Sequence, residues 1–335
     1  MATAHLSGLA VGSALTRRGV AGGLALAPLA AAAQPAGYPD RPVRLVVGFP
    51  PGGPNDLLSR ILAPRVGELL RQTVVVENKS GSNGEIATAF VAKAPPDGYT
   101  LGMATNGSTT IAPAIGRKLP YDARVDLAAV ALVASSPMLL VVRNDLPAAS
   151  LTELLRLARE RPGALNAGSA GSGSPTHLGL ELLKSMAGVD IVHVPYKGGG
   201  PLMIDLMAGQ IDLYFGGLTT ALPHVRAGKL RALAVTSLAR SAAAPEIPTL
   251  AESGLAGYDA GIWYGIFAPA GTPSRIVDRL HAVFAEAVRS PDVLRQFAEH
   301  GADPRDLGPA ALARFVVEDM EKWTRLARTA RIVSD

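Results

Sequence analysis

The sequence predicts an α/β protein in which short buried strands alternate with helices. Three observations lead to this fold class. Runs rich in β-branched residues, such as VRLVVG (43–48) and TVVVEN (73–78), have the length and composition of buried strands. Longer stretches such as LTELLRLARER (151–161) have leucines at helical spacing. The length of 335 residues corresponds to about two domains at roughly 100–200 residues each, enough to bury a sizeable core.

Composition excludes several classes of protein. The chain is 48% hydrophobic and 18% charged, so it is neither a disordered nor a collagen-like sequence. It has no cysteine, which excludes a disulfide scaffold, a thiolate zinc site and a lipid anchor on an N-terminal cysteine. The net charge of +4 comes from basic and acidic residues scattered along the chain. We therefore expect no nucleic-acid partner.

The first 33 residues differ from the rest of the chain. They contain Arg17 and Arg18, no acidic residue, a short apolar run and the small-residue end AAA at 31–33. These are the parts of a secretory signal peptide, so we expect cleavage near Ala33 and export to a bacterial periplasm. A membrane anchor is the alternative, but the apolar run is shorter than the ~20 residues of a spanning helix. The arginine pair leaves the general secretory and the twin-arginine routes both open.

From Tyr38 onward, strands and helices are expected in a regular alternation. The first strand leads into the turn FPPGGP (49–54) and a helix over 57–70, with Asn55 or Asp56 as its cap and a kink or break at Pro64. Further strands are expected at 73–78, 100–105, 127–134, 138–143, 165–168, 191–196, 211–215, 231–236 and 262–269. Further helices are expected at 151–161, 177–188, 201–209, 273–289, 291–300 and 309–331.

Three loops each follow a strand and precede a helix: FPPGGPND (49–56), GSAGSGSPTH (168–177) and PYKGGG (195–200). Ligands of open α/β sheets bind at the carboxyl ends of strands, where helix N-termini present unpaired N–H groups that favour an anion. Glycine lets a ligand approach the backbone, and serine supplies a hydroxyl donor. Each loop by itself is also compatible with a tight turn. Three loops in comparable positions favour an anion site.

Motifs of other chemistries are missing from the sequence. The loop GSAGSGS has no lysine after its glycines, so it is not a nucleotide-binding P-loop, and FPPGGP does not match GxGxxG. GxSxG, HExxH and clustered metal-ligand patterns do not occur, so we expect neither a cofactor nor a metal. Ser174 and His177 leave a Ser–His hydrolase as an alternative, although a helix cap is the favoured interpretation of the hydroxyl. We expect His193 and His224 to be ordinary polar residues.

Several segments resemble the Bug (TctC-type) solute-binding receptors of tripartite tricarboxylate transporters. The similar stretches follow one another in order over most of the chain. They are YPDRPVRLVVGFPPGGPNDLLSR, VVVENKSGSNGEIA, DGYTLGMAT, LNAGSAGSGSPTHL, VPYKGGGPLMIDLMAGQIDLYF, LPHVRAGKLRALAVT, EIPTLAESGLAGY and WYGIFAPAGTP. One such stretch would be a weak signal, whereas the ordered set is specific.

The resemblance implies a type II periplasmic-binding-protein-like fold, with two α/β lobes, a ligand cleft and two crossing strands, MLLVVR and IWYGIF. Residues 38–140 plus 261–335 would form lobe 1, and residues 141–260 would form lobe 2. The implied function is that of a monomeric receptor, not an enzyme and without a cofactor. It would capture a small carboxylate and deliver it to the membrane permease subunits of a tripartite transporter. An extracytoplasmic sensor that presents the same kind of ligand to a signalling protein is the alternative.

The resemblance also implies the ligand-binding residues. Lobe 1 would contribute Phe49, Gly53, Asn55, Asp56 and Asn106, and lobe 2 would contribute Ser169, Gly173, Ser174, His177, Tyr196, Lys197 and Gly198. Receptors of this family hold a carboxylate through loop amides, hydroxyls and waters, and none of the three loops contains arginine. We interpret Asp56 as a cap or brace of its loop rather than a contact to an anion. Many relatives carry Asp-Asn where this chain has Gly216-Gly217, so the resemblance does not identify the particular ligand.

We expect the exported protein to begin near Gln34, which N-terminal sequencing of a periplasmic fraction checks. Replacing Arg17 and Arg18 by lysine blocks export by a twin-arginine route and leaves a general secretory route largely intact. A membrane-bound product that retains Met1 would contradict the signal-peptide prediction.

Overall fold

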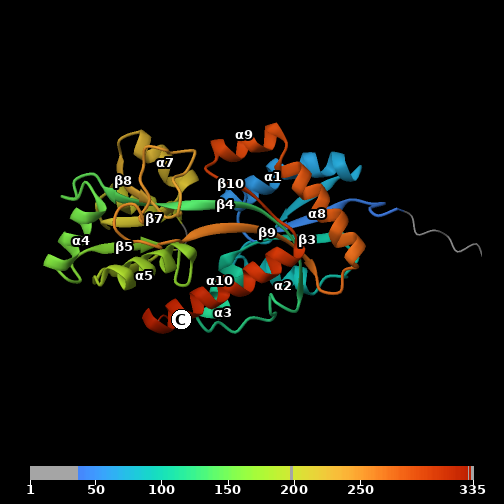
Figure 1. Ribbon diagram of the computed structural model, residues 1–335, viewed down its shortest axis with the longest axis horizontal. Coiled ribbons are helices and arrows are strands. Elements are labelled where there is room, and N and C mark those ends of the chain that lie inside the picture. The colour runs from blue at the N-terminus through green and yellow to red at the C-terminus, as the bar shows by residue number, and fades with distance from the viewer. Residues whose placement is uncertain (1–36, 197–198, 331, 333–335) are drawn as a thin grey trace, which may run out of the picture. The chain divides into compact units, whose positions relative to one another are not determined.

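The computed structural model describes residues 37–196, 199–330 and 332, so the predicted signal peptide lies outside the described part of the chain. The described strands form one sheet in the order β2-β1-β3-β9-β4-β7-β5-β6, and β8 and β10 also pair with β4 (Figure 1). The strands are β1 Val43–Val47, β2 Val74–Asn78, β3 Thr100–Thr105, β4 Leu127–Arg143, β5 Asn166–Ser169, β6 Val192–Pro195, β7 Leu213–Gly217, β8 Leu230–Val235, β9 Gly261–Pro269 and β10 Asp303–Leu307.

Helices follow most of these strands. They are α1 Pro54–Leu70, η1 Ser82–Gly84, α2 Glu85–Ala92, the π-helical turn η2 Gly107–Ile111, α3 Ala112–Ala114, α4 Leu151–Glu160, α5 Pro175–Ala187, α6 Gly199–Met207, α7 Leu218–Arg226, α8 Ser274–Val288, α9 Pro291–Glu299 and α10 Pro309–Ala330. β1 runs parallel to β2 and β3, and β5 runs parallel to β6 and β7. These are the two α/β groups that crossover helices build.

The long strand β4 belongs to both groups. Its first half pairs with β9 and β10, and its second half pairs with β7 and β8. Figure 1 shows β3, α1 and α8 beside the first half and β5, β8 and α4 beside the second. The predicted lobe limits, 38–140 plus 261–335 and 141–260, stay a prediction, because residues 37–335 form one compact unit.

The prediction of two separate strands at 127–134 and 138–143 is wrong, since β4 is continuous. Ser136 and Pro137, in its middle, pair with Ile262 and Gly261 of β9. The Met138 N–H, just after the proline, donates to the Thr236 hydroxyl at 2.7 Å. Proline normally ends a central strand because it lacks an N–H. Here β9 pairs with Ser136 and Pro137 on one side, and Thr236 accepts the next N–H on the other side. The strand therefore continues through the proline.

The first long helix also departs from expectation. α1 begins at Pro54 with Gly53 at its N-cap, so the predicted cap at Asn55 or Asp56 is wrong, and both residues lie in the first turn. The predicted break at Pro64 is also wrong, because the helix continues to Leu70. Pro64 is exposed, so water can solvate the carbonyl that the proline leaves without a donor.

The prediction missed α2, α7 and β10. β10 has the sequence DPRDL, and most of its residues are exposed, so it carries no apolar alternation by which a strand is recognised. Its only partner among the described residues is β4. Pairing with β4, a contact distant in sequence, makes this polar segment a strand.

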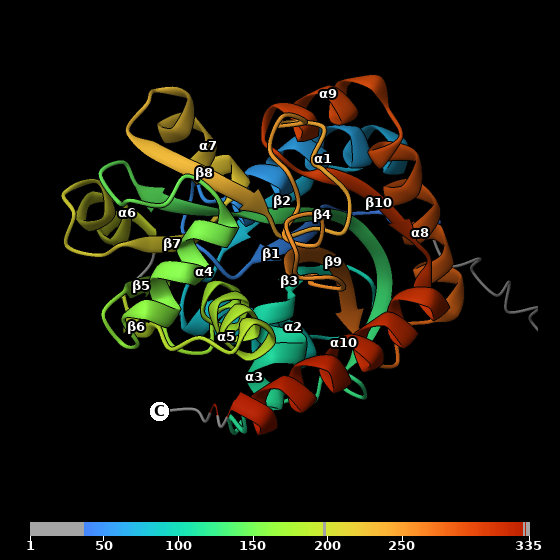
Figure 2. The same ribbon diagram turned by 60° about the vertical axis from the view of Figure 1, so that its left-hand side comes forward.

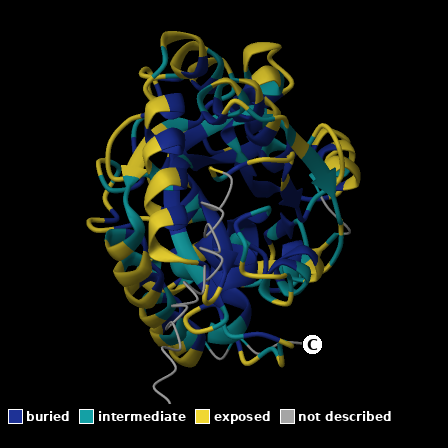
Figure 3. Cartoon of the chain, turned by 90° about the vertical axis from the view of Figure 1, so that its right-hand side faces the viewer, coloured by how far each residue is buried: buried dark blue, intermediate teal, exposed yellow. Residues whose placement is uncertain are grey.

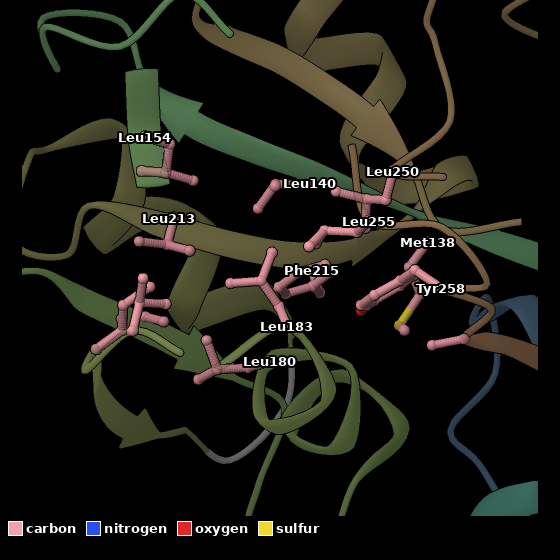
Figure 4. Packing of buried hydrophobic residues seen from close by; sticks show 14 of the residues in the cluster. Met138, Leu140, Leu154, Leu180, Leu183, Leu213, Phe215, Leu250, Leu255 and Tyr258 are labelled. Atoms are coloured by element: carbon pink, nitrogen blue, oxygen red, sulfur yellow. The ribbon is translucent and has the colours of Figure 1, made fainter. Parts of the chain in front are cut away.

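Two large apolar clusters flank the shared strand. One packs β1, β3 and the first half of β4 against α1, α8 and α9, with Phe284 and Phe297 fully buried. The other lies around the second half of β4, where Met138, Phe215 and Tyr258 meet leucines of α4 and α5 (Figure 4). Each fully buried side chain of this size contributes about 1.5–3 kcal/mol. Figure 3 shows the strands mostly buried, while the helices carry their exposed positions on their outer sides.

The C-terminal helix α10 lies against η2, α3 and α5 (Figure 2). Its Asp319 is buried, and one carboxylate oxygen accepts hydrogen bonds from the Thr110 hydroxyl at 2.6 Å and the Trp263 indole N–H at 2.9 Å. Thr110 belongs to η2 and Trp263 to β9. One carboxylate therefore ties three elements that are distant in sequence.

We expect Asp319→Ala to lower the free energy of unfolding by at least about 1.5–3 kcal/mol, because it leaves two buried donors without their charged acceptor. Chemical denaturation of the purified protein measures this loss. Asp292→Ala is the matched control, because its ion pair with Arg295 is exposed and such pairs contribute about 0–1 kcal/mol. Equal stability losses in the two variants would contradict a stabilising role of the hydrogen bonds that Asp319 accepts from Thr110 and Trp263.

Candidate ligand cleft

A cavity of about 700 Å³ lies where the carboxyl ends of strands from both groups meet. From the first group, residues after β1 and β2 and at the end of β3 line it. From the second group, residues after β5 and at the end of β7 line it, and Ile262 and Tyr264 of β9 complete the wall. This is the position at which open α/β sheets bind ligands. The structure thus brings the first two predicted loops to one site.

The starts of several helices face this cavity. Gly53, Pro54 and Asn55 at the start of α1 line it, as do Ser174, Pro175 and Thr176 at the start of α5. Gly107 at the start of η2, Gly199 at the start of α6, and Gly217 and Thr220 at the start of α7 join them. The first N–H groups of a helix have no acceptor within the helix, and its dipole is positive at that end. None of the described lining residues is charged, so the electrostatic character of the wall comes from its backbone groups.

Asn55 and Asp56 are neighbours in α1 but have different surroundings. Asn55 lines the cavity, and its amide donates to the Met103 carbonyl at 3.3 Å. Asp56 does not line it. Its carboxylate accepts hydrogen bonds from the Gly52 N–H at 2.9 Å, from the Asn78 amide at 2.8 Å and from the Arg60 guanidinium at 3.0 Å. Asp56 therefore braces the loop before α1.

The pKa of the Asp56 carboxyl reflects this arrangement. Burial by itself raises the pKa, but the hydrogen bonds from Arg60, Gly52 and Asn78, together with the Arg60 charge, hold it below its usual value. The carboxyl is therefore ionised in the folded protein at neutral pH. Its charge is already neutralised by Arg60, which limits its repulsion of a bound anion.

The other residues predicted in the first group are Phe49, Gly53 and Asn106. Phe49 and Gly53 line the cavity. Asn106 does not, and its amide instead donates to the Gly261 carbonyl at 2.8 Å, which ties the end of β3 to β9. The neighbouring Thr105 does line the cavity, and its buried hydroxyl has no hydrogen-bond partner among the described residues.

Ser174 caps α5, as the sequence predicted, and it also lines the cavity. Its hydroxyl oxygen accepts the His177 backbone N–H at 3.3 Å and lies 2.9 Å from the Thr176 hydroxyl. Thr176 in turn accepts the Ala170 N–H at 2.9 Å. Because only one of the two hydroxyls donates within the pair, one hydroxyl hydrogen remains for a ligand.

Ser169, Gly173 and His177 do not line the cavity, but they support the loop that does. The Gly173 N–H donates to His177 Nδ1 at 3.1 Å, and the His177 ring stacks on that of His193 with 3.8 Å between centroids. The Ser169 hydroxyl lies 2.6 Å from His193 Nε2. His193, expected to be an ordinary polar residue, is thus part of this support.

This geometry argues against the Ser174–His177 hydrolase. The Nδ1 atom of His177 accepts a backbone N–H, and its Nε2 atom lies 3.8 Å from the Glu181 carboxylate. A general base must instead hydrogen-bond the hydroxyl that it activates. The contact between Ser174 and His177 is made by the backbone N–H of His177.

The third predicted loop reaches the site only in part. Tyr196 does not line the cavity, and its hydroxyl donates to the Asp205 carboxylate at 2.8 Å. Burial and this hydrogen bond raise the pKa of Tyr196 to about 12. Lys197 and Gly198 lie outside the described residues. Their predicted contacts with a ligand stay a prediction.

Sequence reasoning missed one complete loop of the site. Ser80, Gly81, Ser82 and Asn83 follow β2, precede α2 and line the cavity. The backbone of this loop lies directly on the end of β1, because a Cβ atom at Gly48 would be 2.4 Å from the Gly84 Cα. The strand–glycine–helix pattern that identified the other loops also occurs in VVVENKSGSNGEIA and was a signal for this one.

The prediction also missed three side chains that strands present to the cavity, Tyr214, Ile262 and Tyr264, and one from the first turn of α7, Thr220. Tyr214 and Tyr264 lie inside apolar runs, where the sequence does not distinguish a core residue from a cavity residue. Burial raises the pKa of Tyr214 to about 12 and that of Tyr264 still higher, so both phenols are neutral donors.

The described part of the chain contains no group of three or more His, Cys, Asp or Glu side chains placed to hold a metal ion. Nor does any helix in residues 37–196 and 199–330 have the length and apolarity to cross a membrane.

Comparison with known proteins identifies the family. Residues 58–331 match the model of the tripartite tricarboxylate transporter family receptor. The chain belongs to this family. A curated relative from Pseudomonas sp. (strain P51), a UPF0065 protein in the tcbD-tcbE intergenic region, is 39% identical over 92% of this chain and 93% of its own. The family consists of receptors and not of enzymes, as the sequence predicted.

Solved structures share the fold. A Rhodopseudomonas palustris protein, Rpa4515 with adipate, has a TM-score of 0.82 and 38% identity, and the match covers 88% of this chain and 99% of that one. The periplasmic binding protein BugD has a TM-score of 0.79 and 35% identity, with 89% and 100% covered. MatC of R. palustris, with bound malate, has a TM-score of 0.77 and 34% identity, with 86% and 99% covered. The predicted periplasmic-binding-protein-like fold and the Bug resemblance are confirmed.

Asp56→Asn tests the loop brace. The variant should lose about 1.5–3 kcal/mol of unfolding free energy at neutral pH, the worth of hydrogen bonds to a charged group. Because the folded pKa of Asp56 is lowered, its contribution is present above the unfolded pKa and is lost as the pH falls through the folded pKa. The stability difference between wild type and variant should therefore narrow below about pH 4. Denaturation curves from pH 7 to pH 3 measure this difference in unfolding free energy. A difference that does not depend on pH would contradict the stabilising role of the ionised Asp56 carboxylate.

Proposed function

We propose that this protein is a periplasmic receptor that binds a small carboxylate between its two lobes and delivers it to the permease subunits of a tripartite transporter. One observation carries the proposal. The starts of α1 and α5, which belong to different strand groups, line the same cavity, and none of its described lining residues is charged. Family membership supports the transporter partner, and the adipate and malate in two similar structures support a carboxylate.

The physical basis is the match between an anion and two helix starts. A charge near a helix N-terminus gains about 0.3–1 kcal/mol at an exposed site and up to ~2 kcal/mol when partly buried. Hydrogen bonds from N–H and hydroxyl groups to a carboxylate are worth about 1.5–3 kcal/mol each. A micromolar complex corresponds to ~8 kcal/mol after the cost of association, so several such contacts must act together with buried apolar surface. These contacts come from backbone and hydroxyl groups and not from a cationic side chain.

The same arrangement links binding to closure of the cleft. A carboxylate that contacts both α1 and α5 joins the two strand groups, so it favours the conformation in which they are close. The segments that connect the groups are β4 and β9, and domain closure about such connections is a common response to ligand. A permease can then distinguish the loaded receptor from the empty one. The export expected from the N-terminal sequence supports a periplasmic location.

We expect the purified protein without residues 1–33 to bind carboxylic acids and to reject the matching amides. Adipate at 100 times its dissociation constant should stabilise the fold by about 2.7 kcal/mol, which raises the melting temperature by a few degrees. Adipamide, with the same length and no charge, should not. Thermal-shift and calorimetric titrations with mono-, di- and tricarboxylates and their amides measure the difference. Equal affinity for acid and amide would refute the anion site.

Delivery is tested separately from binding. Deleting the gene should abolish uptake of the labelled carboxylate at submicromolar concentration, and the gene supplied in trans should restore it. If the protein binds the ligand but its deletion leaves uptake unchanged and abolishes a transcriptional response to the ligand, the sensor alternative replaces delivery.

A further inference from the structure

A groove of about 620 Å³ runs along one edge of the sheet, between α1 and β2. These two elements follow each other in the chain and pack against each other (Figure 2). The described residues that line the groove are all different from those that line the ligand cavity. The groove is therefore a second concave surface, and a ligand in the cavity does not occupy it.

The groove contains the free edge of β2. This strand is the last one at its end of the sheet, and its only strand partner among the described residues is β1. The Thr73 carbonyl accepts the Val43 N–H at 2.9 Å, so it points toward β1. Because backbone groups alternate along a strand, the N–H and carbonyl groups of Val74 and Val76 point away from β1. Both valines line the groove, which thus offers the donors and acceptors that an added strand requires.

Gly67 keeps this edge accessible from the side of α1. A Cβ atom at this position, inside the helix, would lie 3.1 Å from the Gln72 carbonyl oxygen and 3.7 Å from the Val74 nitrogen. A larger side chain there would crowd the outward N–H of Val74. Ala63 and Pro64, about one turn earlier on the same side of the helix, also line the groove. The middle of the groove thus has only short apolar side chains from α1.

An arginine lies at each end of the groove. Arg60 is beside the end of β2, because its guanidinium donates to the Asn78 side chain at 3.1 Å. Its partner Asp56 is buried, with 3% of the side chain exposed, whereas 51% of the Arg60 side chain is exposed. Arg71 is exposed and caps the C-terminal end of α1, at the opposite end of the groove. None of the described residues that line the groove is acidic, so its surface charge is positive.

An extended acidic segment matches both the free edge and the two arginines. Val74 and Asn78 are four residues apart, which corresponds to ~13 Å at ~3.3 Å per residue. In an added strand, every second side chain points toward α1. Acidic residues at positions i and i+4 would therefore reach the two arginines, and an apolar residue at i+2 would contact Ala63 or Pro64.

We propose that this groove is the surface through which the protein docks to its permease, and that the permease contributes an extended acidic segment that pairs with β2. The inference rests on the proposed function, because the permease is the partner assumed there. A second copy of this chain fits the groove less well, since pairing of two β2 edges would bring the arginines of one copy toward those of the other.

The first test uses capped seven-residue peptides and the purified protein without residues 1–33. One peptide has glutamate at positions 2 and 6, valine at position 4 and threonine or serine elsewhere. The second has lysine in place of both glutamates, and the third has its glutamates at positions 2 and 3. NMR titration at millimolar peptide should show binding of the first, with shifted amide signals and slowed hydrogen exchange at Val74 and Val76. The other two should bind at least about threefold more weakly.

Two variants change the groove and leave the ligand cavity intact. Arg71→Glu reverses one charge, and Val76→Pro removes an N–H that β1 does not use, a change that edge strands tolerate. Each should lower the affinity for the first peptide about 3- to 10-fold. Arg314→Glu, at an exposed position of α10, is the control for the charge, and Val76→Ala, which keeps the N–H, is the control for the proline. Both controls should bind the peptide more tightly than the matching groove variant, and melting temperatures check that all four variants fold.

The second test measures delivery. Arg71→Glu and Val76→Pro should bind adipate in calorimetry as the wild type does, and yet they should lower uptake of labelled adipate by cells at least about threefold. Arg314→Glu and Val76→Ala should support uptake close to that of the wild type. A loss of uptake without a loss of adipate affinity is the result that a docking surface predicts, because the groove shares no lining residue with the cavity.

The outcomes separate this inference from the proposed function. Equal binding of the glutamate and lysine peptides, peptide-induced shifts away from β2, or normal uptake by both groove variants would overturn the inference and leave the carboxylate receptor unaffected. A dimer of the protein that Val76→Pro disrupts would assign the edge to a second copy and overturn it too. If deletion of the gene leaves uptake unchanged, delivery and this inference fail together, while carboxylate binding is still decided by the comparison of acids with their amides.

Discussion

The continuous strand β4 is the element on which the rest of the architecture depends. Its 17 residues pair with β9 and β10 in one half and with β7 and β8 in the other, so both strand groups take their positions from it. Because parallel strands of each group end toward the same region, the helices that follow them start there. The cavity and the helix starts that line it are consequences of this shared strand together with β9.

A site made of backbone groups requires a closely packed backbone. Gly48 and Gly84 approach each other so closely that no Cβ atom fits between them, which places the loop after β2 against the end of β1. Asp56 and two histidine side chains then act one layer behind the wall. Asp56 holds the loop before α1, and the stacked His177 and His193 lie behind the loop before α5. The described wall itself is left free of charged side chains, and its amides and hydroxyls are held in place by the packing behind them.

The glycines of the second strand group have a different physical role. In the loops, glycine is required by positive φ angles, as at Gly173 with φ of 72°. At Gly216, the φ angle is ordinary for any residue, and the restriction comes from the ring of Tyr214. The absence of side chains at Gly216 and Gly217 therefore does not simply enlarge the cavity. One large neutral side chain fills part of the space.

The sequence by itself determined the alternation of strands and helices, the family and the loops that form most of the site. These features are local, because strand composition, helical spacing and glycine-rich turns depend on residues close together in the chain. It did not determine which side chain of a loop faces the cavity. Asn55 and Asp56 are adjacent, yet one lines the cavity and the other braces the loop, because successive residues of a helix point about 100° apart. The continuity of β4 through Pro137, the polar strand β10 and the exposure of Tyr214 to the cavity were decided by the tertiary structure. Each of them depends on a partner that is distant in sequence, and a local pattern contains no information about such a partner.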